Sequence, residues 1–185
     1  MKTVIPSASP TLNAQLTSLY EEIMWLRGRP NITSSVARSW YTHACAERFK
    51  KHVRRFTGRI SKSSVDPEAK LQLEHHLRIQ TSLTSLVEKH HTGNLRDPAD
   101  FIDTVIKFEE VHIVTSAENY SARRAKGNYS LAGIELVDFN LLSIEDQSRL
   151  WRRMLLGRVA NHADFNPNNK KPNKSEQATP MKPSD

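Results

Sequence analysis

Proline, glycine and capping residues divide this chain into short segments, and most segments repeat their apolar residues with helical spacing. Ser9 and Pro10 have the order of an N-cap and a first helical residue, and Gly28 follows the last apolar residue of that segment. A second, longer helix is predicted from about Thr33 to Gly58. These helix-boundary residues favour a chain of separate helices joined by short turns.

Further helix starts share an N-cap residue followed by a proline or an acid: Asp66–Glu68, Asp97–Pro98, Thr115–Glu118 and Ser143–Asp146. The β-branched run Val111–Val114 is a possible strand, and residues 130–139 are a second; either stretch is equally compatible with a loop or a helix end. The predicted fold class is therefore mainly α, with about five to six helices and at most a small β element in the second half.

The chain has 185 residues, enough for one sizeable core with tails. We predict a flexible N-terminus (residues 1–8), a helical globular domain (9–163) and a disordered, basic C-terminal tail (164–185). The tail is rich in proline, asparagine and lysine and poor in apolar residues, so it cannot offset its own ordering entropy.

Positive charge is concentrated between residues 48 and 62. The cations of this segment are Arg48, Lys50, Lys51, Arg54, Arg55, Arg59 and Lys62. No acid lies among them, and together they match the formal net charge of the whole chain, +7. Cations near a helix C-terminus are favoured by the helix dipole, but this many exceed what capping requires. The cluster predicts contacts to the phosphates of DNA or RNA.

Two further groups of cations lie later in the chain. Arg123 and Arg124 are assigned the same nucleic-acid-binding role, and a third group consists of Arg149, Arg152, Arg153 and Arg158. Whether these groups share one face is left open by the sequence. The single cysteine, Cys45, excludes an internal disulfide, and no apolar run approaches the roughly 20 residues that cross a bilayer. A cytoplasmic protein without a membrane partner is expected, and no cofactor is indicated by composition.

The histidine pair His90-His91, followed after a gap by the stretch from Val114 to Asn119, resembles the HNH nucleases of phages and mobile elements. The resemblance covers residues 90–119. It implies that His90 or His91 is the general base and that Asn119 or His112 orients it or helps hold one divalent metal, Mg²⁺ or similar. His91 and His112 would then be the metal ligands.

Other interpretations of the same residues remain open. Thr115 and Glu118, inside the HNH-like stretch, also have the spacing of a capping box, and Glu109-Glu110-Val111 stands where the nuclease family has an Asn-Leu pair. Arg38 and His43 have the spacing found in helical ribonucleases of the HEPN kind.

The sequence therefore favours a small basic protein that binds nucleic acid through helix ends rich in arginine and lysine, of the sort that phages or mobile elements encode. A metal-dependent, HNH-like endonuclease is the first alternative. The second is a helical interaction or regulatory protein that docks an acidic partner protein.

Overall fold

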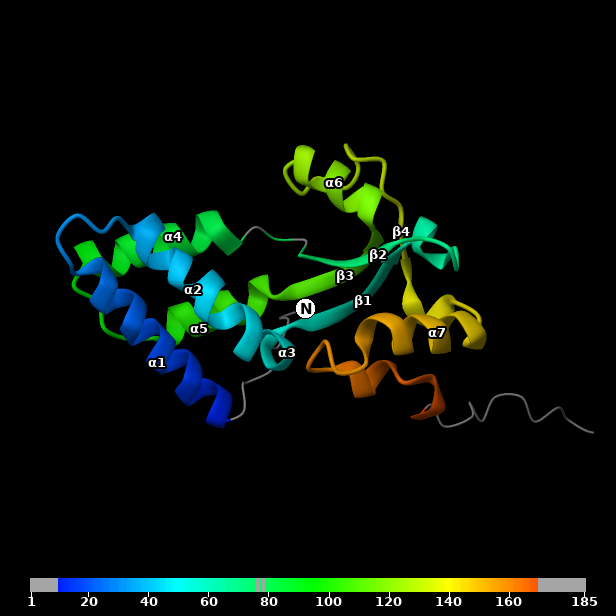
Figure 1. Ribbon diagram of the computed structural model, residues 1–185, viewed down its shortest axis with the longest axis horizontal. Helices are drawn as coiled ribbons and strands as arrows, with labels where there is room; N and C mark the ends of the chain where they lie inside the picture. Colours follow the sequence, from blue (N-terminus) through cyan, green and yellow to red (C-terminus); the bar gives the residue numbers. More distant parts are fainter. Residues whose placement is uncertain (1–9, 76, 78, 170–185) are drawn as a thin grey trace, which may run out of the picture.

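The computed structural model describes residues 10–75, 77 and 79–169, apart from the side chains of residues 10, 44–48 and 79. In chain order its main elements are α1 (Pro10–Arg27), α2 (Ser34–Arg48), α3 (Lys50–Val53), β1 (Arg55–Ser61), β2 (Leu71–His75), α4 (Ile79–Thr92), α5 (Ala99–Phe108), β3 (Glu110–Thr115), α6 (Ser116–Arg124), β4 (Leu136–Asp138) and α7 (Ile144–Leu150) (Figure 1). A π-helical turn, Trp151–Leu155, continues α7. The predicted flexible N-terminus, the tail from residue 170 and the side chains of Cys45 and Arg48 lie outside this description.

The helices α1, α2, α4 and α5 pack together at one end of the molecule (Figure 1). Their apolar faces meet in a core that includes Leu16, Ile23, Leu83, Phe101 and Val105, all fully buried. These residues recur at helical spacing within their segments, which explains why the boundaries of α1 and α5 follow the sequence pattern closely.

A four-stranded mixed sheet occupies the other end, with the strand order β2-β3-β1-β4. The central pair, β1 and β3, is parallel, while β2 and β4 are antiparallel to their neighbours. Side chains alternate across β3: Val111 and Ile113 join a second core with α7, and His112 lies on the opposite face. Figure 1 shows α6 above the sheet and α7 below it.

The predicted fold class, mainly α with a minor β element in the second half, is wrong. The chain has an α/β fold, because β1 and β2 lie in the first half of the sequence and complete a sheet with β3 and β4. The second predicted helix ends before Gly58, and β1 takes over at Arg55. Phe56 has helical spacing from Val53, but it also alternates with Gly58 and Ile60, and pairing with β3 selects the extended form.

The third predicted helix also starts later than expected. Asp66-Pro67-Glu68 forms a turn, and Leu71 to His75 then form the edge strand β2 before α4 begins at Ile79. Within β2, Leu71 and Leu73 pack against the core beneath the sheet, an alternation typical of a half-buried strand.

Several local predictions are confirmed. The run Val111–Val114 lies in β3, and Thr115 and Glu118 form a reciprocal capping box at the start of α6. Of the second possible strand, residues 130–139, only 136–138 are extended and form β4, whereas residues 130–133 form a turn. The described fold also continues past the predicted boundary at residue 163. The ring of Phe165 packs 4.7 Å from that of Phe56, centroid to centroid, and Pro167 is buried.

No described helix combines the length and the apolar character needed to cross a membrane.

Candidate nucleic-acid interface

The predicted basic cluster is centred on α3 and the residues that lead into β1. Lys50, Lys51 and Arg54 line an open cavity of about 520 Å³ together with Arg158, a residue more than a hundred positions later in the chain. Leu71–Leu73 of the edge strand β2 and Met154 form the remaining lining. No acidic side chain is part of this lining, so among the described residues four cations and no anion face the cavity. We call it the α3 cavity.

A second open cavity, of about 620 Å³, lies on the other side of Lys51. Its basic lining residues are Lys51, His52, Arg55 and His162, and the N-terminal turns of α1 supply Thr11, Leu12 and Gln15. Again no acidic residue is part of the lining. Because Lys51 lines both cavities, the positive surface continues from one to the other around α3.

A buried carboxylate behind α3 fixes one of these cations. Oε2 of Glu109 lies 3.8 Å from Nε of Arg54 and 2.9 Å from Nε2 of His75, and Oε1 accepts a hydrogen bond of 2.7 Å from the Tyr41 hydroxyl. Burial alone would raise the pKa of Glu109, but the hydrogen bonds from His75 and Tyr41 and the charges of His75 and Arg54 hold it below its ordinary value. Glu109 is therefore a buried anion that forms an ion pair with Arg54 at the wall of the α3 cavity.

The cations of α3 itself have no comparable partner. Among the described residues, Lys50, Lys51 and Arg158 form no ion pair and no side-chain hydrogen bond. Like charges gathered around one cavity without a counter-ion raise the free energy of the fold, and a bound polyanion relieves that repulsion.

The segment after α7 is held in place by a side-chain clamp on β1. Oδ1 of Asn161 accepts a hydrogen bond of 2.8 Å from the backbone N–H of Phe56, and Nδ2 of Asn161 donates one of 2.9 Å to the carbonyl of Phe56. The N–H of Ala160 donates to the carbonyl of Arg54 at 2.8 Å. Gly157, at φ +68°, makes the turn that brings Arg158 back to α3. Convergence of Arg158 with the basic cluster thus depends on contacts that are distant in sequence.

Other predicted cations are placed differently. Lys62 pairs with Glu135 at 3.4 Å on the exposed surface, so its charge is partly neutralised within the protein. Arg59 is exposed on β1. Of the third group of cations, Arg149 and Arg153 donate to backbone carbonyls of the segment between β1 and β2. These two arginines therefore stabilise the fold by bonding this segment to the residues around α7.

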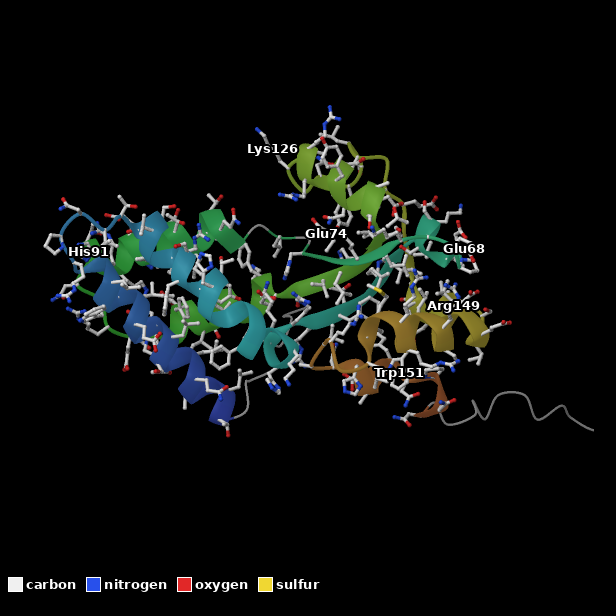
Figure 2. All side chains as sticks on the ribbon, viewed as in Figure 1. Glu68, Glu74, His91, Lys126, Arg149 and Trp151 are labelled. Atoms are coloured by element: carbon white, nitrogen blue, oxygen red, sulfur yellow. The ribbon has the colours of Figure 1, made fainter. Side chains whose placement is uncertain are left out.

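Arg123 and Arg124 lie on α6 and line a third cavity, of about 730 Å³, on the other side of the edge strand β2. Tyr120 belongs to the same lining, and Cζ of Arg124 lies 5.9 Å from the centroid of its ring. We call this the α6 cavity. Figure 2 shows Glu74 of β2, another lining residue, on the side of the strand that faces α6.

The residues of the HNH-like stretch are not brought together. His90 is 2% exposed inside the helical bundle, where its Nδ1 lies 2.8 Å from the Tyr20 hydroxyl, while His91 is exposed at the bundle end farthest from α6 (Figure 2). His112 lies in the sheet with its Nδ1 2.6 Å from Oγ1 of Thr57.

Asn119 lies on α6 and donates to Oε1 of Gln72. Its own neighbourhood therefore contains β2 and not the end of α4. No group of three or more His, Cys, Asp or Glu residues in the described ranges has an arrangement that would hold a metal ion.

Four residues that line the three cavities were not part of the site predicted from the sequence: His52, His162, Tyr120 and Arg158. Arg158 was visible as a cation, but only the clamp at Asn161 reveals which face it joins. The sequence does indicate that Tyr120 faces solvent, because arginines follow it at positions 123 and 124, one helical turn away.

Comparison with protein-family models, curated proteins and solved structures found no significant match to this chain.

Proposed function

We propose that this protein binds nucleic acid, and that the α3 cavity and its continuation around Lys51 are the main contact surface for the phosphate backbone. The observation that supports this most directly is the convergence of Lys50, Lys51, Arg54 and Arg158 on one open cavity whose lining contains no acid. The formal net charge of +7 and the pI near 9.7 favour the same kind of partner.

Contacts of this type give affinity with little sequence information, because phosphates are the same along every sequence. Lysine supplies mobile point charges, and Arg54, whose Nε lies 3.8 Å from Oε2 of Glu109, supplies a guanidinium. We therefore propose strong dependence on salt and weak preference among sequences.

The test is fluorescence anisotropy with labelled DNA and RNA oligonucleotides, using the variant Lys50→Ala/Lys51→Ala/Arg158→Ala. Arg54 is left in place because it also pairs with buried Glu109, and its loss would confuse binding with folding. The described side chains of the three altered residues make no ion pair, so the thermal unfolding midpoint should change little. Affinity should fall at least tenfold, since each lost phosphate contact removes a released counter-ion.

A matched control removes the same number of positive charges at the far end of the bundle: Arg29→Ala/Lys89→Ala/Arg96→Ala. These residues lie in or next to the turns that join α1 to α2 and α4 to α5, away from α3 (Figure 1). The control should bind as the wild type does. Equal losses in both variants would show a mere net-charge effect, and full affinity in the first variant would refute the proposed surface.

A further inference from the structure

The α6 cavity has the dimensions and the lining of a site for a flat polar ligand. Its volume of about 730 Å³ lies in the range of small-molecule sites, roughly 300–1,000 Å³. The end of β2, the first turn of α4 and one face of α6 enclose it. The helix is held over the sheet by the capping box and by the Ser61 hydroxyl, which donates to Glu118 Oε2 at 2.5 Å.

Tyr120 is the residue that sets the chemistry of this cavity. Tyr120 is 64% exposed although it lines a concave surface, so much of its ring is open to a ligand. Exposed aromatic rings in basic grooves are the surfaces on which unpaired bases stack, and every base has a π face to offer. Arg124, near the outer limit of cation–π distance from the ring, places a positive charge beside Tyr120 that a phosphate of a bound strand could pair with.

The opposite wall carries hydrogen-bonding groups. Gln80 contributes a side-chain amide to the lining and Glu74 contributes a carboxylate, while Asn119 lies beside Tyr120 on α6 and already donates to Gln72. Amides can both donate to and accept from base edges, and a carboxylate accepts from the amino groups of cytosine and adenine. Arg123, on the same face of α6, adds a second positive charge.

The α6 cavity also adjoins the α3 cavity along one strand. Leu73 lines the α3 cavity and the next residue, Glu74, lines the α6 cavity, so that the edge strand β2 forms a shared rim. A flexible single strand can follow such a rim from one basic surface to the other. A base in a duplex must first leave its stack and its partner to reach a ring in a cavity.

We propose that the α6 cavity holds one unpaired base of a single-stranded nucleic acid, stacked on Tyr120, with Arg124 on a neighbouring phosphate. The inference rests on the proposed function and makes its ligand more specific: single-stranded DNA or RNA, with the phosphates beyond the stacked base in the α3 cavity.

The experiment uses the full chain and an oligonucleotide of about 12 nucleotides, a length within the usual site size of single-strand binders. The same sequence is prepared as DNA, as RNA and as a duplex, and each single strand carries 2-aminopurine, whose fluorescence is quenched when it stacks on an aromatic ring. The variants are Tyr120→Ala and Tyr120→Phe. Trp25→Ala is the matched control, because Trp25 is 60% exposed with Arg29 over its ring at 4.2 Å, on α1.

Tyr120→Ala should weaken single-strand binding about tenfold or more and abolish the quenching, which is the effect of losing one stacked base. Its duplex affinity should stay that of the wild type. Tyr120→Phe, which keeps the ring, should bind and quench like the wild type, and Trp25→Ala should be unaffected. The better-bound single strand, DNA or RNA, identifies the source of the ligand.

Two results would overturn the stacking site while leaving the proposed function intact. One is wild-type single-strand binding by Tyr120→Ala while Lys50→Ala/Lys51→Ala/Arg158→Ala loses it. The other is an equal loss for single strand and duplex in Tyr120→Ala, which would mean that the ring supports α6 and stacks on no base. Failure of the wild type to bind either form would refute both proposals together.

Discussion

The Nε2 atom of His75 lies 2.9 Å from Oε2 of Glu109, a carboxylate that is 1% exposed where the helical bundle meets the sheet. His75 ends the edge strand β2, Glu109 directly precedes β3, and Tyr41, which donates to the same carboxylate, lies on α2. Arg54 reaches it from the end of α3. One buried anion thus joins both parts of the fold and holds an arginine at the α3 cavity.

Replacing Glu109 by Gln should destabilise the protein by roughly 3 kcal/mol, because removal of one partner from a buried pair leaves the other uncompensated. The amide keeps the volume and an acceptor for Tyr41, but it carries no charge for Arg54 and His75. Urea unfolding followed by circular dichroism would measure the change.

The control is Glu135→Gln, which breaks the exposed pair with Lys62 and should change stability by less than about 1 kcal/mol. A similarly small effect at Glu109 would show that this carboxylate contributes nothing as a charge.

The lowered pKa of Glu109 predicts how the stability of the protein changes with pH under acidic conditions. Its pKa is held below the ordinary value of 4.5, so above that pH it is ionised in both the folded and the unfolded chain and its full contribution is present. As the pH falls through 4.5, the unfolded chain takes up the proton first and stability declines until the native carboxyl is protonated. The decline between pH 5 and 3, roughly, should be shallower in Glu109→Gln than in the wild type. Identical slopes in thermal unfolding across that range would contradict this role.

Removing the clamp at Asn161 should affect both stability and binding. Asn161→Ala leaves the backbone N–H and carbonyl of Phe56 without their partner, at a cost of about 2 kcal/mol. It also releases the segment that carries Arg158, so oligonucleotide affinity should fall even at temperatures where the variant is folded. Asn168→Ala, an exposed asparagine later in the same segment, is the control and should change neither quantity.

The capping box of α6 offers a local test. Thr115→Ala removes the acceptor of the Glu118 backbone N–H and should cost about 1 kcal/mol. Hydrogen exchange should accelerate in α6 and leave the bundle unchanged, because the lost hydrogen bond lies in the first turn of this helix. Thr104→Ala, whose hydroxyl donates to the Asp100 carbonyl within α5, is the comparison and should leave α6 unaltered. Uniform acceleration across the chain would mean that α6 does not open independently.

The sequence predicts elements whose signals are local. The helical spacing of α1 and α5, the β-branched run of β3 and the capping box at Thr115 all lie within a few neighbouring residues, and the structure contains each of them. The strand β1 was missed because Phe56 satisfies a helical and an extended pattern equally well. Its parallel partner β3 is 55 positions away (Phe56 pairs with Val111), and only that pairing decides between the two patterns.

The candidate site, too, was predictable from the sequence only where its signal is local. The density of cations around Lys50 is visible in the sequence, but their convergence with Arg158 depends on the turn at Gly157 and the clamp at Asn161. The role of Glu109 was missed for two reasons. The adjacent acids Glu109 and Glu110 match no functional motif, and the partner of Glu109, His75, was expected inside the third helix.

The salt dependence of oligonucleotide binding tests the central claim most directly. For the wild type, the logarithm of the association constant should fall linearly with the logarithm of salt concentration, with a slope of about −0.7 to −0.9 for each phosphate neutralised. In Lys50→Ala/Lys51→Ala/Arg158→Ala the slope should become shallower by roughly 2 to 3, because each lost cation no longer releases a counter-ion. An unchanged slope in this variant would show that the phosphates are bound elsewhere and would contradict the account.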